Sequence, residues 1–69
     1  MRHRRTLTPD ALWVLTNRQR IGWSQYRLAA NINQPHGIHS GRICEIETGQ
    51  KPLRPEWRDQ MQNIFAQAA

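Results

Sequence analysis

The stretch from residue 39 to residue 51 gathers side chains that form directional hydrogen bonds. Arg42 holds five N–H donors in a rigid fork, which matches two neighbouring acceptor atoms at once. His39 and Ser40 can donate or accept, whereas an ionised Glu45 only accepts. These residue types suit the recognition of a polar surface, provided that the chain presents them on one side of a single element.

Metal binding and nucleophilic catalysis have weaker support in the same region. His36, His39 and Cys44 are types that bind zinc, but two histidines and one thiol without a fourth ligand match no usual zinc spacing. A cysteine nucleophile also needs an orienting group and a pocket, and the pattern indicates neither. We therefore expect no metal, no cofactor and no enzymatic activity. The single cysteine suits a reducing compartment, where it acts as a small apolar side chain.

The chain is strongly basic, with a net charge of +5 and a sequence pI near 11.2. Residues 1–27 hold six arginines against Asp10 alone. Such an excess suits a polyanion, because each phosphate neutralised by Arg or Lys releases counterions, but it also suits an acidic membrane or solubility alone. No apolar run approaches the roughly 20 residues of a membrane helix, and the basic start lacks the apolar segment of a secretory signal. We expect a cytoplasmic protein without a membrane partner.

Helix signals dominate the rest of the chain. Its 69 residues, 38% of them hydrophobic, have room for one domain, and no run alternates with period two over the length of a strand. The expected fold is all-α and compact, with four helices, or five if the loop adds a turn of helix. We expect a flexible basic arm at 1–7, one domain at 8–66 and a frayed tail at 67–69. The predicted helices are 9–20 after a cap at Thr8, 24–31 capped by Ser24, 39–48 capped by His39 or Ser40 and closed by Gly49, and a last helix from Pro55.

Each predicted helix has an apolar stripe that would face a shared core. Trp13 points away from the stripe predicted for the first helix and needs another partner. We expect Trp13 and Trp57 to be packing residues rather than base-stacking ones, with a place in a dimer interface as the alternative for either. The predicted stripes are Ala11, Leu12, Leu15 and Gln19; Leu28, Ala29 and Ile32; Ile43 and Ile46; and Trp57, Met61, Ile64 and Phe65.

Two blocks of the sequence resemble the Cro and phage-repressor-like helix-turn-helix proteins, also called the XRE family. The block "RQRIGWSQYRLA", residues 18–29, is similar to the family pattern Arg-x-x-x-Gly-hydrophobic-Ser-Gln-x-x-Leu-Ala. The block "GIHSGRICEIETGQKP", residues 37–52, is similar to the pattern around the family's recognition helix. Together the blocks cover roughly half of the chain. The positions in register in the second block are Ile43, Ile46, Glu47, Gly49 and Pro52.

The resemblance implies a lambda-repressor-like domain whose recognition helix, about 39–48, lies in the major groove of DNA. Arg42 would bind a guanine through O6 and N7, and Glu45 would accept from a cytosine amino group or exclude wrong sequences. Arg18 and Glu47 would form an ion pair joining the first helix to the end of the third. The implied DNA-binding residues are Ser24, Gln25, Arg27, His39, Ser40, Gly41, Arg42, Cys44, Glu45, Thr48 and Lys51. Arg2, Arg4 and Arg5 would either reach DNA or form a solvated terminus.

The sequence departs from the family pattern at the turn. Ala29 and Ile43 are fourteen positions apart, whereas a tight helix-turn-helix needs about ten. The extra residues are most simply Asn33 to His36. A longer turn would change how the recognition helix is aimed relative to the helix before it.

The residues and the resemblance leave more than one function open. The first hypothesis is a sequence-specific regulator that binds double-stranded DNA, a phage, prophage or plasmid repressor acting on its own promoter. It would work as a homodimer on an inverted-repeat operator, in the bacterial cytoplasm or nucleoid. The lengthened turn and Glu45 motivate an alternative, a protein-interaction or inhibitor module on the same scaffold. The antitoxin of a toxin–antitoxin pair would combine DNA with a protein partner.

Overall fold

The computed structural model describes residues 8–32 and 37–68, and this part of the chain folds into four α-helices without a strand. The all-α prediction is therefore confirmed. The predicted arm at 1–7 with Arg2, Arg4 and Arg5, the inserted residues 33–36 and Ala69 lie outside the described residues. The helices are α1 (Pro9–Arg20), α2 (Gln25–Ala30), α3 (Ser40–Glu47) and α4 (Pro55–Gln67).

The helix ends follow from local chemistry. Thr8 Oγ1 accepts from the amide of Ala11 at 3.0 Å, and Ser24 Oγ accepts from the amide of Arg27 at 3.0 Å. Of the two candidate caps of α3, His39 takes the role, and its Nδ1 accepts from the Arg42 amide at 3.2 Å. Each contact satisfies a first-turn amide that has no partner within its helix.

Two glycines end helices by adopting a conformation that side chains disfavour. Gly22, after α1, has a φ of 73°, and Gly49, after α3, has a φ of 80°. Both values lie in the left-handed region, where a Cβ would clash with the following carbonyl. The first and third helices therefore end just before a glycine, as the sequence predicts.

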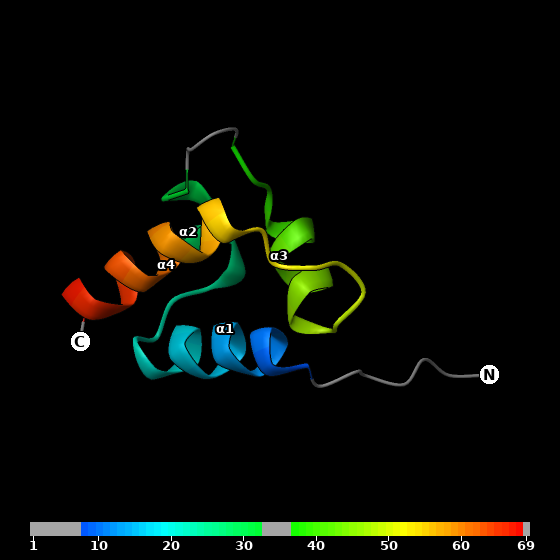
Figure 1. Ribbon diagram of the computed structural model, residues 1–69. Helices are drawn as coiled ribbons and strands as arrows, with labels where there is room; N and C mark the ends of the chain where they lie inside the picture. Colours follow the sequence, from blue (N-terminus) through cyan, green and yellow to red (C-terminus); the bar gives the residue numbers. More distant parts are fainter. Residues whose placement is uncertain (1–7, 33–36, 69) are drawn as a thin grey trace.

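The four helices enclose one core. Figure 1 shows α1 lying along one side of the molecule, with α3 beside its first half and α4 crossing above it. α3 packs against both α1 and α2, so it is the central element. The predicted stripes of α2, α3 and α4 are confirmed, with Ile64 only half-buried. The buried apolar cluster is Val14, Leu28, Ala29, Ile32, Ile43, Ile46, Leu53, Trp57, Met61 and Phe65.

The predicted stripe of α1 is wrong apart from Ala11. Ala11 and Val14 are fully buried, whereas Leu12 is 51% exposed, Leu15 is half-buried and Gln19 is exposed. The stripe that contacts α3 begins with Ala11 and Val14 and reaches Arg18 one turn later. In this orientation Arg18 also reaches the carboxylate of Glu47 on α3.

Trp13 finds its partner on α4. Its ring meets that of Phe65 edge-on, with centroids 5.3 Å apart and planes at 71°. The guanidinium of Arg58 covers the same ring at 4.3 Å and also bonds Asp10 at 2.9 Å. Trp13 and Trp57 are thus packing residues, as predicted.

The C-terminal end of α4 differs slightly from the prediction. Gln67 is the last helical residue rather than the first residue of a tail, and the amide of Ala68 still bonds Ile64 O at 2.9 Å. Within the described ranges, no helix has the length and apolar character needed to cross a bilayer.

Candidate nucleic-acid interface

α3 presents two chemically different faces. Ile43 and Ile46 are buried in the core, while Gly41 and Cys44 are exposed and Glu45 is half-exposed. This division follows from the helical repeat, which places residues three and four apart on one side. α3 therefore turns Gly41, Cys44 and Glu45, all implied DNA-binding residues, away from the core.

A buried carboxylate fixes α3 to both preceding helices. Glu47 is 4% exposed. Its Oε2 accepts from Arg18 Nε at 2.6 Å and its Oε1 from Arg18 Nη2 at 3.1 Å. Gln25 Nε2 donates to the same Oε1 at 2.9 Å, and Arg18 Nη1 donates to Trp23 O at 2.8 Å. The ion pair expected between Arg18 and Glu47 is present. Two N–H groups of the guanidinium bond the two carboxylate oxygens, which is the bidentate geometry of strong ion pairs.

Gln25 belongs to this network, which the sequence did not indicate. It is one of the implied DNA-binding residues, but one of its two amide N–H donors bonds Glu47 Oε1. The second donor remains for another acceptor. Gln25 therefore connects the start of α2 to the end of α3 and holds the two helices in a fixed relation.

Arg42 and Glu45 lie together on the outward face. Arg42 Nε donates to Glu45 Oε1 at 2.9 Å, and both side chains are about one-third exposed, 34% and 36%. Glu45 is the one acceptor that the described chain gives to this guanidinium side chain, and it engages Nε alone. The two terminal nitrogens stay available to an outside partner, while Glu45 limits the rotamers that Arg42 can adopt.

The remaining predicted contacts divide into structural and available groups. Thr48 Oγ1 donates to Cys44 O at 3.0 Å, so this hydroxyl serves the end of α3. His39 uses Nδ1 as a cap, which leaves Nε2 for other contacts. The guanidinium of Arg27 stacks on the Trp23 ring at 4.3 Å and is exposed. Ser40 is half-buried and Lys51 is exposed.

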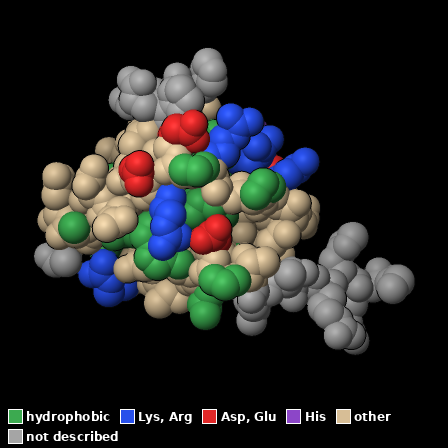
Figure 2. All heavy atoms as spheres, in the orientation of Figure 1, with side chains coloured by type: hydrophobic (Ala, Val, Ile, Leu, Met, Phe, Trp, Pro, Cys, Tyr) green, Lys and Arg blue, Asp and Glu red, His purple; other side chains and the backbone are tan. Residues whose placement is uncertain are grey.

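The surface mixes both signs of charge. Figure 2 shows Lys and Arg side chains gathered near one edge of one face, with acidic side chains and apolar patches between the other basic positions. Among the described residues, no three His, Cys, Asp or Glu side chains come together as a metal ion would require.

Comparison with protein-family models, with curated proteins and with solved structures finds no match for this chain. The arrangement of α2 and α3 and the residues on their outer faces are therefore the basis for a functional assignment.

Proposed function

We propose that the protein is a sequence-specific regulator that binds double-stranded DNA with α3 in the major groove. The observation that carries the proposal is the outward face of α3. On this face, small exposed residues lie beside Arg42, whose Nε is held by Glu45 and whose two terminal nitrogens have no acceptor among the described residues. An α-helix is about 10–12 Å wide with its side chains, which fits a major groove about 12 Å wide.

The proposed base contacts follow from donor and acceptor chemistry. Arg42 would donate to O6 and N7 of one guanine, while Glu45, its neighbour, would accept from a cytosine amino group. Gly41 and Cys44 are small enough to let the helix approach the base edges. Glu45 would also repel phosphates, so that a misplaced duplex is disfavoured.

Contacts to the DNA backbone would come from the start of α2 and from the loop after α3. Arg27 and Lys51 are exposed cations that can neutralise phosphates, and Gln25 retains one N–H donor. Ser24 would act through its cap, which orders the first turn of α2. The net charge of +5 favours such contacts, because counterion release favours binding of a basic protein to DNA.

The resemblance to Cro and phage-repressor-like proteins supports the narrower part of the proposal. By that resemblance the protein is a phage, prophage or plasmid repressor that binds as a homodimer to an inverted repeat and controls its own promoter. One observation favours the alternative of a protein-binding module or antitoxin. Tyr26 on α2 and Leu12 on α1 are large hydrophobic side chains that are 75% and 51% exposed, so each is available to a protein partner.

Selection of bound duplexes from a random library tests the base contacts. The native chain should enrich one motif that contains a guanine. Arg42→Ala should weaken binding to that motif by about 1–3 kcal/mol and relax the preference at the guanine. Arg58→Gln is the matched control, since it removes the same charge from a residue that pairs with Asp10 and is none of the proposed DNA contacts, and it should enrich the same motif. A motif that is unchanged in Arg42→Ala would contradict the proposed contact, and enrichment of no motif would favour the protein-binding alternative.

A further inference from the structure

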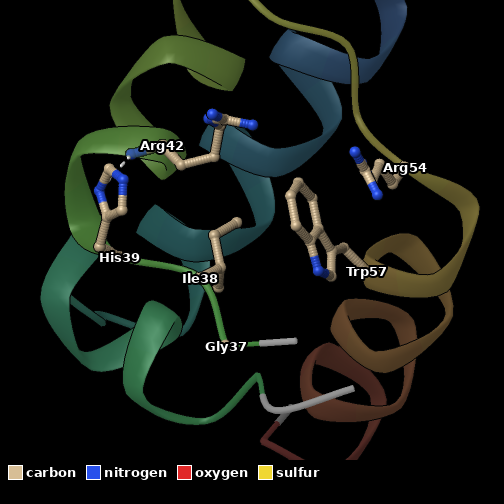
Figure 3. Close-up of a pocket in the computed structure, with 6 residues that line it drawn as sticks. All are labelled: Gly37, Ile38, His39, Arg42, Arg54 and Trp57. Carbon is tan, nitrogen blue, oxygen red and sulfur yellow. Dashed lines mark hydrogen bonds between the residues drawn. The ribbon is translucent and has the colours of Figure 1, made fainter. Parts of the chain in front are cut away.

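A hollow of about 220 Å³ lies between the start of α3 and the start of α4 (Figure 3). Its volume suits a ligand of about one substituted ring, since one water takes up about 30 Å³ of liquid. Two of its walls are apolar side chains and two are guanidinium groups. The lining residues are Gly37, Ile38, His39, Arg42, Arg54 and Trp57.

The charge around the hollow is positive and incompletely compensated. No carboxylate is found among the described residues that line it. Arg54 places its guanidinium carbon 5.4 Å from the centre of the Trp57 ring, and no carboxylate among the described residues pairs with it. Arg42 gives only Nε to Glu45. In Figure 3 these two guanidinium groups lie on either side of the Trp57 indole ring, and both line the hollow.

Trp57 adds a flat apolar wall and an unused donor. The residue is 6% exposed, and its Nε1 is buried without a hydrogen-bond acceptor in the described part of the chain. The nitrogen-bearing edge of the ring lies toward Gly37 in Figure 3. Buried donors in native proteins are nearly always paired, so an unpaired one needs an explanation. Ile38 faces the same space and completes an apolar surface on which a ring can pack.

We propose that this hollow binds a small aromatic carboxylate. The ring packs between Ile38 and Trp57, because aromatic side chains favour offset or edge contacts with other rings. The carboxylate lies between Arg42 and Arg54, which bind it through charge-assisted hydrogen bonds. Binding itself is independent of DNA. Its consequence rests on the proposed function: since Arg42 serves both sites, the carboxylate competes with the operator.

An NMR titration of the full ¹⁵N-labelled chain with benzoate tests the site. The indole N–H signal of Trp57 should shift and saturate with a Kd of about 1 mM or lower, while those of Trp13 and Trp23 report on the rest of the molecule. Arg54→Gln should weaken binding about tenfold, because it removes a charged donor. Arg58→Gln, whose guanidinium covers Trp13 outside the hollow, is the matched control and should bind like the native chain.

Two further probes separate the parts of the ligand. Benzyl alcohol keeps the ring without the charge, and inorganic phosphate keeps the charge without the ring, so each should bind at least about tenfold more weakly than benzoate. The proposal is overturned by the absence of a saturable Trp57 shift, by equal binding of either probe, or by an Arg54→Gln variant that binds benzoate normally.

The competition is measured separately with a labelled duplex carrying the selected motif. Benzoate at saturating concentration should lower the affinity of the native chain for the duplex and should have little effect on Arg54→Gln. Unchanged affinity in the native chain would refute the competition. Absence of any duplex complex would instead refute the proposed function, and the NMR result on the carboxylate site would stand.

Discussion

Glu47 carries the charge that is most deeply placed in the described part of the molecule. Arg18 and Gln25 both donate to it, so three helices meet at one carboxylate. Removal of one partner from a buried ion pair is strongly destabilising, because the other charge stays in a poorly solvated place. Glu45, on the same helix, forms an exposed pair and provides a direct comparison.

Glu47→Gln should lower the free energy of unfolding by on the order of 3 kcal/mol. The change keeps the size of the side chain and removes the charge that Arg18 faces. Its matched control, Glu45→Gln, should cost less than about 1 kcal/mol, because exposed pairs contribute little. Urea denaturation followed by tryptophan fluorescence measures both. Similar losses in the two variants would show that the ion pair of Arg18 is not a principal link between α1 and α3.

The side-chain contacts of individual residues could be predicted only in part from the sequence. The pair of Arg18 and Glu47 could be anticipated by resemblance, since both positions match the family pattern. Gln25 could not be placed beside Glu47, because that contact depends on how α2 meets α3 across a turn of unusual length. Arg54 and Trp57 are three positions apart across the start of a helix, a spacing that permits their cation–π contact, but the hollow beside them depends on α3.

At the scale of elements, the helix ends were more predictable than the helix orientations. Thr8, Ser24 and Gly49 act on neighbouring backbone groups, so their effects are local and visible in the sequence. The buried face of α1 could not be predicted from the sequence. The pattern placed the larger apolar residues Leu12 and Leu15 in the predicted stripe. The structure instead buries the smaller Ala11 and Val14, which brings Arg18 to Glu47.

The rotation of α1 gives a prediction for a pair of variants. Val14→Ala should cost about 2 kcal/mol, since it removes two buried methyl groups at about 0.8 kcal/mol each and leaves a cavity. Leu12→Ala removes a larger side chain that is half exposed, and it should cost less than about 1 kcal/mol. Thermal or urea unfolding distinguishes them. A larger loss in Leu12→Ala than in Val14→Ala would mean that α1 turns its leucine face to the core in solution.

At the scale of the whole molecule, a small domain combines a net charge of +5 with a central helix whose outer face is open. The charge favours any polyanion, whereas the base contacts proposed for α3 would favour one DNA sequence over others. These two contributions respond differently to salt. Phosphate contacts weaken as counterions are added, while hydrogen bonds to base edges set the difference between a correct and a scrambled duplex.

The most direct test compares the affinity of the native chain for the selected duplex and for a scrambled duplex of equal length across a salt series. Both affinities should fall as salt rises, with a linear dependence on a logarithmic scale. The selected duplex should bind about 1,000-fold more tightly at physiological salt. Equal, weak binding to the two duplexes at every salt concentration would contradict the reading of DNA sequence by α3.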